Sequence, residues 1–150
     1  MATQRSTSQA YRLSLVLLLL SALFWSGCRA RRIKEAELAD KAARYAEAAL
    51  LYQKLYRTTS RKEPEHKGYF AFKAAENYRM MRNPSRALGY YRMATRLLPL
   101  DSASMLTQAR LCEMLGKYTE AADMVTHFLE LYPNEPHAAA FLTELQQKEQ

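Results

Sequence analysis

A pattern of small, aromatic and proline residues recurs along this sequence with a step of 34 residues. The best-preserved copy consists of Ala87, Tyr91, Ala94 and Pro99. Adding 34 to each number gives Ala121, Val125, Phe128 and Pro133, and subtracting 39 gives Ala48, Tyr52, Leu55 and Ser60. A nearly fixed period of this length indicates a chain built from stacked copies of one supersecondary unit.

Two further features repeat in the same frame. A small residue stands twelve positions before the first alanine of each copy, at Ala36, Ala75 and Ala109. Turn sequences also align, and they read Ala43-Arg44-Tyr45, Arg82-Asn83-Pro84 and Gly116-Lys117-Tyr118. This pattern resembles the tetratricopeptide-repeat (TPR) family, whose unit is a pair of helices. The resemblance implies an all-α, TPR-type solenoid with units at 29–62, 68–101 and 102–135, and we expect the extra residues Glu63–Lys67 to form a longer loop.

Helix propensity is high along these units, because Ala and Leu are frequent and runs of β-branched residues are absent. Asn83 is expected to cap a helix that starts at Pro84, and Gly116 to take the left-handed conformation that ends a helix. Small residues at Ala75, Ala87 and Ala94 allow two helices to approach closely. Tyr78 and Tyr91 are expected to fill the space between pairs. The predicted helices cover 30–42, 46–58, 66–81, 84–97, 102–115, 119–131 and 136–148.

The last predicted helix, at 136–148, begins like the first helix of a fourth unit. Its apolar residues are Ala139, Phe141, Leu142 and Leu145, and residues 146–150 are polar. A solenoid needs such an end to cover its last apolar face, so we expect a capping helix. A chain shortened from something longer is the alternative.

The first 28 residues have the three parts of a secretory signal. Residues 1–12 carry two arginines and no acid, and the apolar run Leu13–Trp25 is too short to span a membrane comfortably. Ser26-Gly27-Cys28 resembles the lipobox of bacterial lipoproteins, although Trp25 stands where that family usually has an aliphatic residue. The resemblance implies a signal peptide at 1–27 and a mature N-terminus at Cys28 that carries a diacyl lipid. The alternative is an uncleaved N-terminal anchor.

The chain has a net charge of +7, and much of the excess directly follows Cys28, at Arg29, Arg31, Arg32 and Lys34. Residues 28–34 are therefore expected to form a basic tether ahead of a TPR domain at 35–150. This cluster either rests on anionic lipid headgroups or is simply solvated, and the sequence favours neither. The other charges alternate in sign along helices and no recognition motif accompanies them, which argues against a nucleic-acid partner.

The sequence contains no pattern typical of catalysis or cofactor binding. His66, His127 and His137 lack metal-ligand spacing, four glycines leave little room for a phosphate loop, and no nucleophile motif is present. Cys112 lies among apolar residues and is expected to be a small buried hydrophobe. We therefore expect no enzyme activity, cofactor, metal or small-molecule substrate.

In the TPR family the first helix of each unit lines a concave face. The resemblance therefore assigns a partner-binding groove to Tyr69, Phe72, Glu76, Arg79 and Met80 in unit two and to Leu106, Arg110, Glu113 and Met114 in unit three. Tyr69, Phe72 and Leu106 are equally suited to packing and to binding. Arg79 and Arg110 are expected to be exposed to carboxylates or carbonyls. The family's lysine–asparagine carboxylate clamp is absent, because residues such as Phe72 and Arg110 occupy its places.

The lipobox, the basic stretch and phrases such as Tyr45-x-Glu47-Ala48-Ala49 and Ala75-Glu76-Asn77-Tyr78-Arg79 support a narrower resemblance. They are similar to the N-terminal part of Bacteroidetes outer-membrane lipoproteins associated with type IX secretion and gliding. That resemblance implies a lipid-anchored scaffold in the bacterial cell envelope, on the outer membrane facing the periplasm, that binds a protein of an envelope or secretion complex. Two alternatives are a periplasmic chaperone-like holdase and a docking or regulatory subunit for a cell-wall enzyme.

Overall fold

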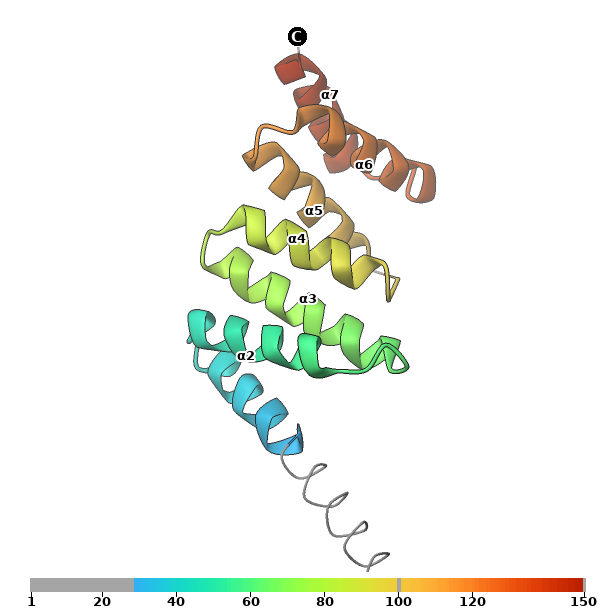
Figure 1. The fold of residues 1–150 in the computed structure, drawn as a ribbon. Helices are drawn as coiled ribbons and strands as arrows, with labels where there is room; N and C mark the ends of the chain where they lie inside the picture. Colours follow the sequence, from blue (N-terminus) through green and yellow to red (C-terminus); the bar gives the residue numbers. More distant parts are fainter. Residues whose placement is uncertain (1–28, 100, 150) are drawn as a thin grey trace, which may run out of the picture.

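The computed structural model describes residues 29–99 and 101–149, and every regular element in these ranges is an α-helix. A first helical segment covers residues 29–41. It is followed by α2 (Tyr45–Thr58), α3 (Pro64–Met80), α4 (Pro84–Thr95), α5 (Ser102–Met114), α6 (Tyr118–Leu131) and α7 (Pro136–Glu149). Successive helices run antiparallel and stack in chain order into an elongated array (Figure 1). The predicted fold class is confirmed: the described residues form a TPR-type solenoid of three helix pairs and a seventh, capping helix.

Each described helix begins and ends within two residues of its predicted positions. The one difference with a structural consequence is at the start of α3. Residues 63–67 were expected to form a longer loop, but α3 already begins at Pro64. Proline suits the first helical turn because it lacks the N–H that would have no partner there. Lys67 then reaches back to the end of α2, where its Nζ donates to the carbonyl oxygens of Tyr56 at 2.8 Å and Thr59 at 2.7 Å. The extra residues therefore lengthen α3 by about one turn instead of lengthening the loop.

The turn inside each helix pair has the same backbone conformation in all three units. Ala43, Arg82 and Gly116 occupy equivalent positions and have φ values of 56°, 55° and 70°. In each turn the next N–H bonds to a carbonyl five residues back, as from Arg44 to Ala39 at 2.9 Å and from Lys117 to Cys112 at 2.9 Å. This arrangement is the Schellman motif that commonly ends helices. The predicted left-handed Gly116 is confirmed, as is the cap on α4, where the Asn83 side chain accepts from the Arg86 N–H at 3.2 Å.

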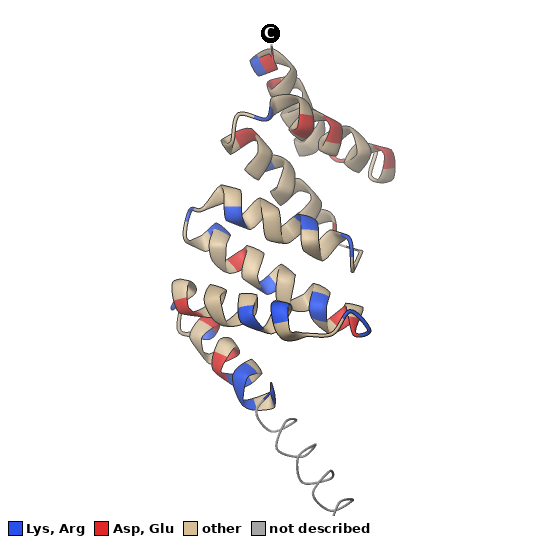
Figure 2. Ribbon diagram, viewed as in Figure 1, with Lys and Arg blue, Asp and Glu red and all other residues tan. Residues whose placement is uncertain are grey.

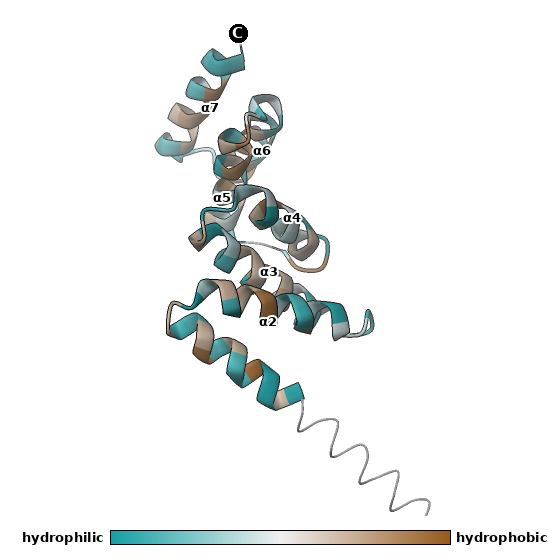
Figure 3. Ribbon diagram, turned by 60° about the vertical axis from the view of Figure 1, so that its left-hand side comes forward, coloured by the Kyte–Doolittle hydropathy of each residue, from teal (hydrophilic) through white to brown (hydrophobic). Residues whose placement is uncertain are grey.

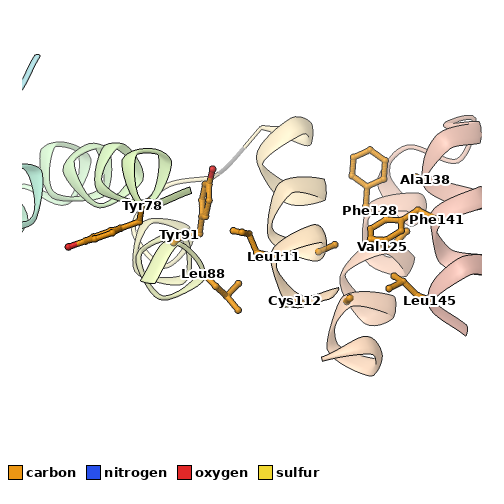
Figure 4. Packing of buried hydrophobic residues seen from close by; sticks show 14 of the residues in the cluster. Tyr78, Leu88, Tyr91, Leu111, Cys112, Val125, Phe128, Ala138, Phe141 and Leu145 are labelled. Carbon is orange, nitrogen blue, oxygen red and sulfur yellow. The ribbon is translucent and has the colours of Figure 1, made fainter. Parts of the chain in front are cut away.

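Alanines let the paired helices approach, and tyrosines fill the space around them. Ala75, Ala87 and Ala94 are fully buried, and so are Tyr78 and Tyr91, as predicted. Figure 4 shows Leu88 and Tyr91 of α4 facing Leu111 of α5, so the core continues from unit two into unit three. The interface between α4 and α5 is the smallest of those between consecutive helices from α2 to α7. An ion pair between Arg92 and Glu120 adds a link from α4 to α6 across this junction.

The helix α7 covers the apolar face of α6, as predicted for a cap. Its buried residues are Ala138, Phe141 and Leu145, which share one face, whereas Ala139 points outward. The end of α7 next to the C-terminus is hydrophilic (Figure 3). Helical phase explains why Ala138 and not Ala139 is buried, because residues three and seven positions apart fall on the same side.

Candidate partner-binding groove

Two open hollows lie between α3 and α5, where the sequence placed a groove. The Arg79 hollow has a volume of about 440 Å³ and is lined by Arg79, Leu106, Thr107, Arg110, Leu111 and Met114. The Tyr69 hollow has a volume of about 250 Å³ and is lined by Tyr69, Phe72, Leu98, Pro99, Asp101 and Ser104. Six of the nine groove residues assigned from the sequence line one hollow or the other. Glu76, Met80 and Glu113 do not.

The apolar residues of the groove divide between packing and exposure. Phe72 is half-buried, and its ring packs edge-on against that of buried Tyr91, with 5.9 Å between centroids. Leu106 is also half-buried, whereas Tyr69 is 39% exposed and Met114 is 63% exposed. Exposed side chains of this size are the ones that lose most water contact when a partner covers them. Tyr69 and Met114 are therefore the apolar positions with most surface left to bury.

Both arginines of the groove are exposed, and both have carboxylate neighbours on their own helix. Arg79 donates to Glu76 at 2.6 Å, and Arg110 donates to Glu113 at 3.1 Å. Each pair spans three residues of one helix; the arginine side chains are 41% and 53% exposed, whereas those of Glu76 and Glu113 are 28% and 15% exposed. The exposed guanidinium N–H groups of both arginines remain available to a carboxylate of a partner as well. Glu76 and Glu113 thus act as internal partners of the arginines and not as lining residues.

The Arg110 end of the groove is joined to α7 by a network of charges. Glu113 accepts from Lys148 at 2.7 Å as well as from Arg110, and Lys148 also donates to Glu144 at 2.6 Å. Partial burial alone would raise the pKa of Glu113, but hydrogen bonds from Lys148 and Arg110 hold it below its usual value. The same two carboxylates raise the pKa of Lys148. The capping helix thus fixes the side chains at this end of α5.

Several lining residues were missed by the sequence analysis. Leu98, Pro99 and Asp101 come from the α4–α5 connection, and the repeat pattern gives no information on how that connection folds over the groove. Thr107 and Leu111 neighbour assigned positions on α5. A signal for Thr107 was present, because it stands 34 residues after Lys73 and hence in the repeat position that follows Phe72 and Leu106.

The predicted basic residues lie on the first helical segment. Arg29, Arg31, Arg32 and Lys34 all fall in the helical segment 29–41, so the expected boundary between residues 34 and 35 lies inside a helix. Arg29 forms an ion pair with Glu63 at 2.7 Å. The predicted signal peptide at 1–27 and Cys28 lie outside the described residues. No helix of the described ranges is both long and apolar enough to cross a membrane.

The described residues include no group of three or more His, Cys, Asp or Glu side chains arranged to hold a metal ion. His66, His127 and His137 are exposed and lie on different elements. Cys112 is fully buried, as predicted, with its Sγ 3.9 Å from the Sδ of Met124. Burial, helped by the charge of Glu120, raises the pKa of the Cys112 thiol to about 11. The thiol is therefore protonated at neutral pH and poorly suited to nucleophilic chemistry.

No family model matches this sequence, and no curated protein is similar to it. Among solved structures, the chain is similar to the Yersinia enterocolitica type III secretion chaperone SycD, whose crystal structure is a complex with a peptide of the translocator YopD. The TM-score is 0.62 at 15% sequence identity, over 80% of this chain and 93% of SycD. The shared feature is the fold. At this identity the likeness does not extend to individual binding residues.

Proposed function

We propose that this chain is a membrane-anchored scaffold that docks a protein partner of a cell-envelope or secretion complex in the groove between α3 and α5. The observation that carries the proposal is the pair of hollows, which combine apolar side chains with two exposed arginines. Exposed apolar anchors beside arginines are typical of protein-binding surfaces. A solved structure of the same fold holds a peptide of another protein, which supports a polypeptide as the occupant.

The membrane part of the proposal comes from the sequence. Ser26-Gly27-Cys28 follows the apolar run Leu13–Trp25, and a lipid on Cys28 would place the solenoid on a bacterial envelope membrane. The resemblance to Bacteroidetes lipoproteins favours the outer membrane, facing the periplasm. Metabolic labelling with an alkyne fatty acid tests this step. The chain has two cysteines, so one variant removes the proposed lipid site and the other serves as its control. Cys28→Ser should abolish labelling, and Cys112→Ala should leave it unchanged. Labelling that persists in Cys28→Ser would show that Cys28 is not the site of a lipid anchor.

The groove is tested by affinity purification from solubilised envelopes of cells that make the protein. Arg79→Ala combined with Met114→Ala removes two exposed side chains of the Arg79 hollow without touching the core. Recovery of the stoichiometric partner should fall by about tenfold, equivalent to about 1.4 kcal/mol of binding free energy. The matched control, Lys117→Ala with Met93→Ala, removes an exposed cation and an exposed methionine that line neither hollow. Equal recovery with both variants would show that the groove is not the docking site.

A holdase function has one observation in its favour. Met80, Met81, Met93 and Met114 are all between 38% and 63% exposed. Methionine is flexible and polarizable, so surfaces rich in it adapt to partners of different shape. A holdase would suppress aggregation of several unrelated unfolded proteins, whereas the scaffold would retain one partner in fixed stoichiometry.

A further inference from the structure

The positive charge of this protein is concentrated in its first helix pair. Residues 29–62 contain ten Lys or Arg and four Asp or Glu, which gives this pair a net charge of +6. Residues 63–150 contain ten Lys or Arg and eleven Asp or Glu, which gives the remainder a net charge of −1. An asymmetry of this size produces a local positive potential that a uniform distribution of the same charges would not produce.

The antiparallel arrangement gathers most of these cations at one end of the pair. The beginning of segment 29–41 lies beside the end of α2 and the α2–α3 turn, and the ion pair from Arg29 to Glu63 records this proximity. Figures 1 and 2 show basic residues on the first helical segment, along α2 and at the following turn. We name this surface the basic end; it consists of Arg29, Arg31, Arg32, Lys34, Lys54, Arg57, Arg61 and Lys62.

Most of these cations are turned toward water and lack a neighbouring acid. Six of the eight are exposed, and Arg29 and Arg32 are half-buried. Within the described ranges, Arg29 is the one member with a carboxylate closer than 4 Å. The opposite end of the same pair differs, because Arg44 is bound to Glu47 at 2.9 Å and Asp40 is bound to Lys73 at 2.7 Å. The excess charge at the basic end is therefore not neutralised internally.

We propose that the basic end docks on an anionic lipid surface and sets the orientation of the solenoid on the membrane. Continuity of the chain favours lipid over an acidic protein, because Arg29 directly follows Cys28 and lies four positions after the apolar run Leu13–Trp25. Either a lipid on Cys28 or an uncleaved apolar run would hold this end of the chain at a bilayer. Lys and Arg near a membrane surface are attracted by anionic headgroups, and a basic patch reinforces a neighbouring apolar or acyl anchor. Because the helices stack in chain order, docking at this end places α5, α6 and α7 farther along the stack from the bilayer than the first pair. The proposal does not require Cys28 to be acylated.

Amine acetylation of the full chain tests the proposal at individual lysines. The chain is bound to vesicles of phosphatidylcholine alone or of phosphatidylcholine with phosphatidylglycerol, and single-hit acetylation rates are read by mass spectrometry. Lys34, Lys54 and Lys62 report on the basic end. Lys41 lies seven residues from Lys34, about 10 Å along the same helix, and reports on the other end of the pair. Lys117 is an exposed control in unit three.

We expect acetylation of Lys34, Lys54 and Lys62 to slow several-fold on the anionic vesicles, with Lys41 less affected and Lys117 unchanged. Salt at roughly 0.5 M should restore the rates, because it screens charges beyond a few ångströms. Equal rates on both vesicle types would overturn the proposal. Protection by soluble polyglutamate but not by anionic vesicles would assign the surface to an acidic polypeptide instead. The partner-capture experiment tests the groove and not the basic end. The docking of a partner in the groove and the docking of the basic end on lipid can therefore be contradicted independently.

Discussion

The guanidinium carbon of Arg110, on α5, lies 3.4 Å from the centre of the Phe141 ring, on α7. Phe141 is 3% exposed, so its ring belongs to the core that α7 shares with α6, while its face supports a groove arginine. Arg110 also lies 3.7 Å from Glu144 of α7. The capping helix therefore has two roles: it covers the last apolar face of the solenoid, and it holds one side chain of the candidate groove.

Replacing Phe141 by Leu should destabilise the protein by about 1–2 kcal/mol, because ring volume and the cation–π contact are both lost. In a double-mutant cycle with Arg110→Ala, urea denaturation should give a coupling free energy of about 0.5–1 kcal/mol. The matched control cycle combines Phe128→Leu with Arg110→Ala. The buried ring of Phe128, on α6, packs against Tyr132, the residue that follows this helix. Additive effects in both cycles would show that the Arg110–Phe141 contact contributes nothing.

Gly116→Ala and Gly89→Ala should change stability in opposite directions. Neither glycine has a neighbour within 4 Å of an added Cβ, so backbone conformation decides both outcomes. Gly116 has a φ of 70°, which costs a residue with a Cβ about 1 kcal/mol, whereas Gly89 lies within α4, where Ala is favoured by about 0.5–1 kcal/mol.

The same argument predicts that Ala43→Gly is neutral or stabilising, because Ala43 already has a φ of 56°. Thermal unfolding followed by circular dichroism measures all three variants. Destabilisation by Gly89→Ala as large as that by Gly116→Ala would contradict the conformational explanation.

The repeat predicted the helices and turns well because both are local consequences of spacing and turn chemistry. Asn83 and Gly116 are in their predicted conformations because a helix cap depends on a few neighbouring residues. The start of α3 was misplaced because the contact from Lys67 to the end of α2 is not visible in the repeat frame.

Contacts between distant parts of the chain account for most of what the sequence did not reveal. Arg110 and Phe141 are 31 positions apart, and nothing in the helix pattern indicates that they touch. The basic end has the same origin. Arg29 to Lys34 were recognised as one cluster along the sequence, but the antiparallel pair adds Lys54, Arg57, Arg61 and Lys62 to it. The orientation of side chains across helices had to come from the structure.

The ion pair from Lys73 to Asp40 joins the first helical segment to α3, and it should stabilise the stack more than the exposed pairs do. Its N–O distance is 2.7 Å and its side chains are 28% and 21% exposed. Asp40 also accepts from the Nδ2 of buried Asn77 at 3.2 Å. Burial alone would lower the pKa of Lys73, but the hydrogen bond and charge of Asp40 raise it.

A double-mutant cycle of Lys73→Met and Asp40→Asn should give a coupling free energy of about 1 kcal/mol in chemical denaturation. The control cycle uses Arg44→Met and Glu47→Gln, whose side chains are 55% and 45% exposed, and should give about 0.3 kcal/mol. A coupling for Lys73 and Asp40 no larger than the control would show that partial burial does not strengthen this pair.

Cys112 should make the protein less stable as the pH rises above about 9. Burial raises the pKa of its thiol to about 11 in the folded protein, whereas an unfolded cysteine titrates near about 8.5. Between these values the folded state retains a proton that the unfolded state has lost. Raising the pH therefore favours unfolding, by up to about 1.4 kcal/mol per pH unit.

Cys112→Ala isolates this contribution, because all other titratable groups are the same in both proteins. The difference in unfolding free energy between wild type and Cys112→Ala should be constant below pH of about 8 and should shrink between about 9 and 11. Urea denaturation at half-unit pH steps measures it. Native Cys112 should also resist alkylation at pH of about 9, since the thiolate is the reactive form. The opposite result is a difference in unfolding free energy between the two proteins that stays constant up to pH of about 11, together with rapid alkylation of Cys112. It would show that the thiol ionises readily and is not enclosed between α5 and α6.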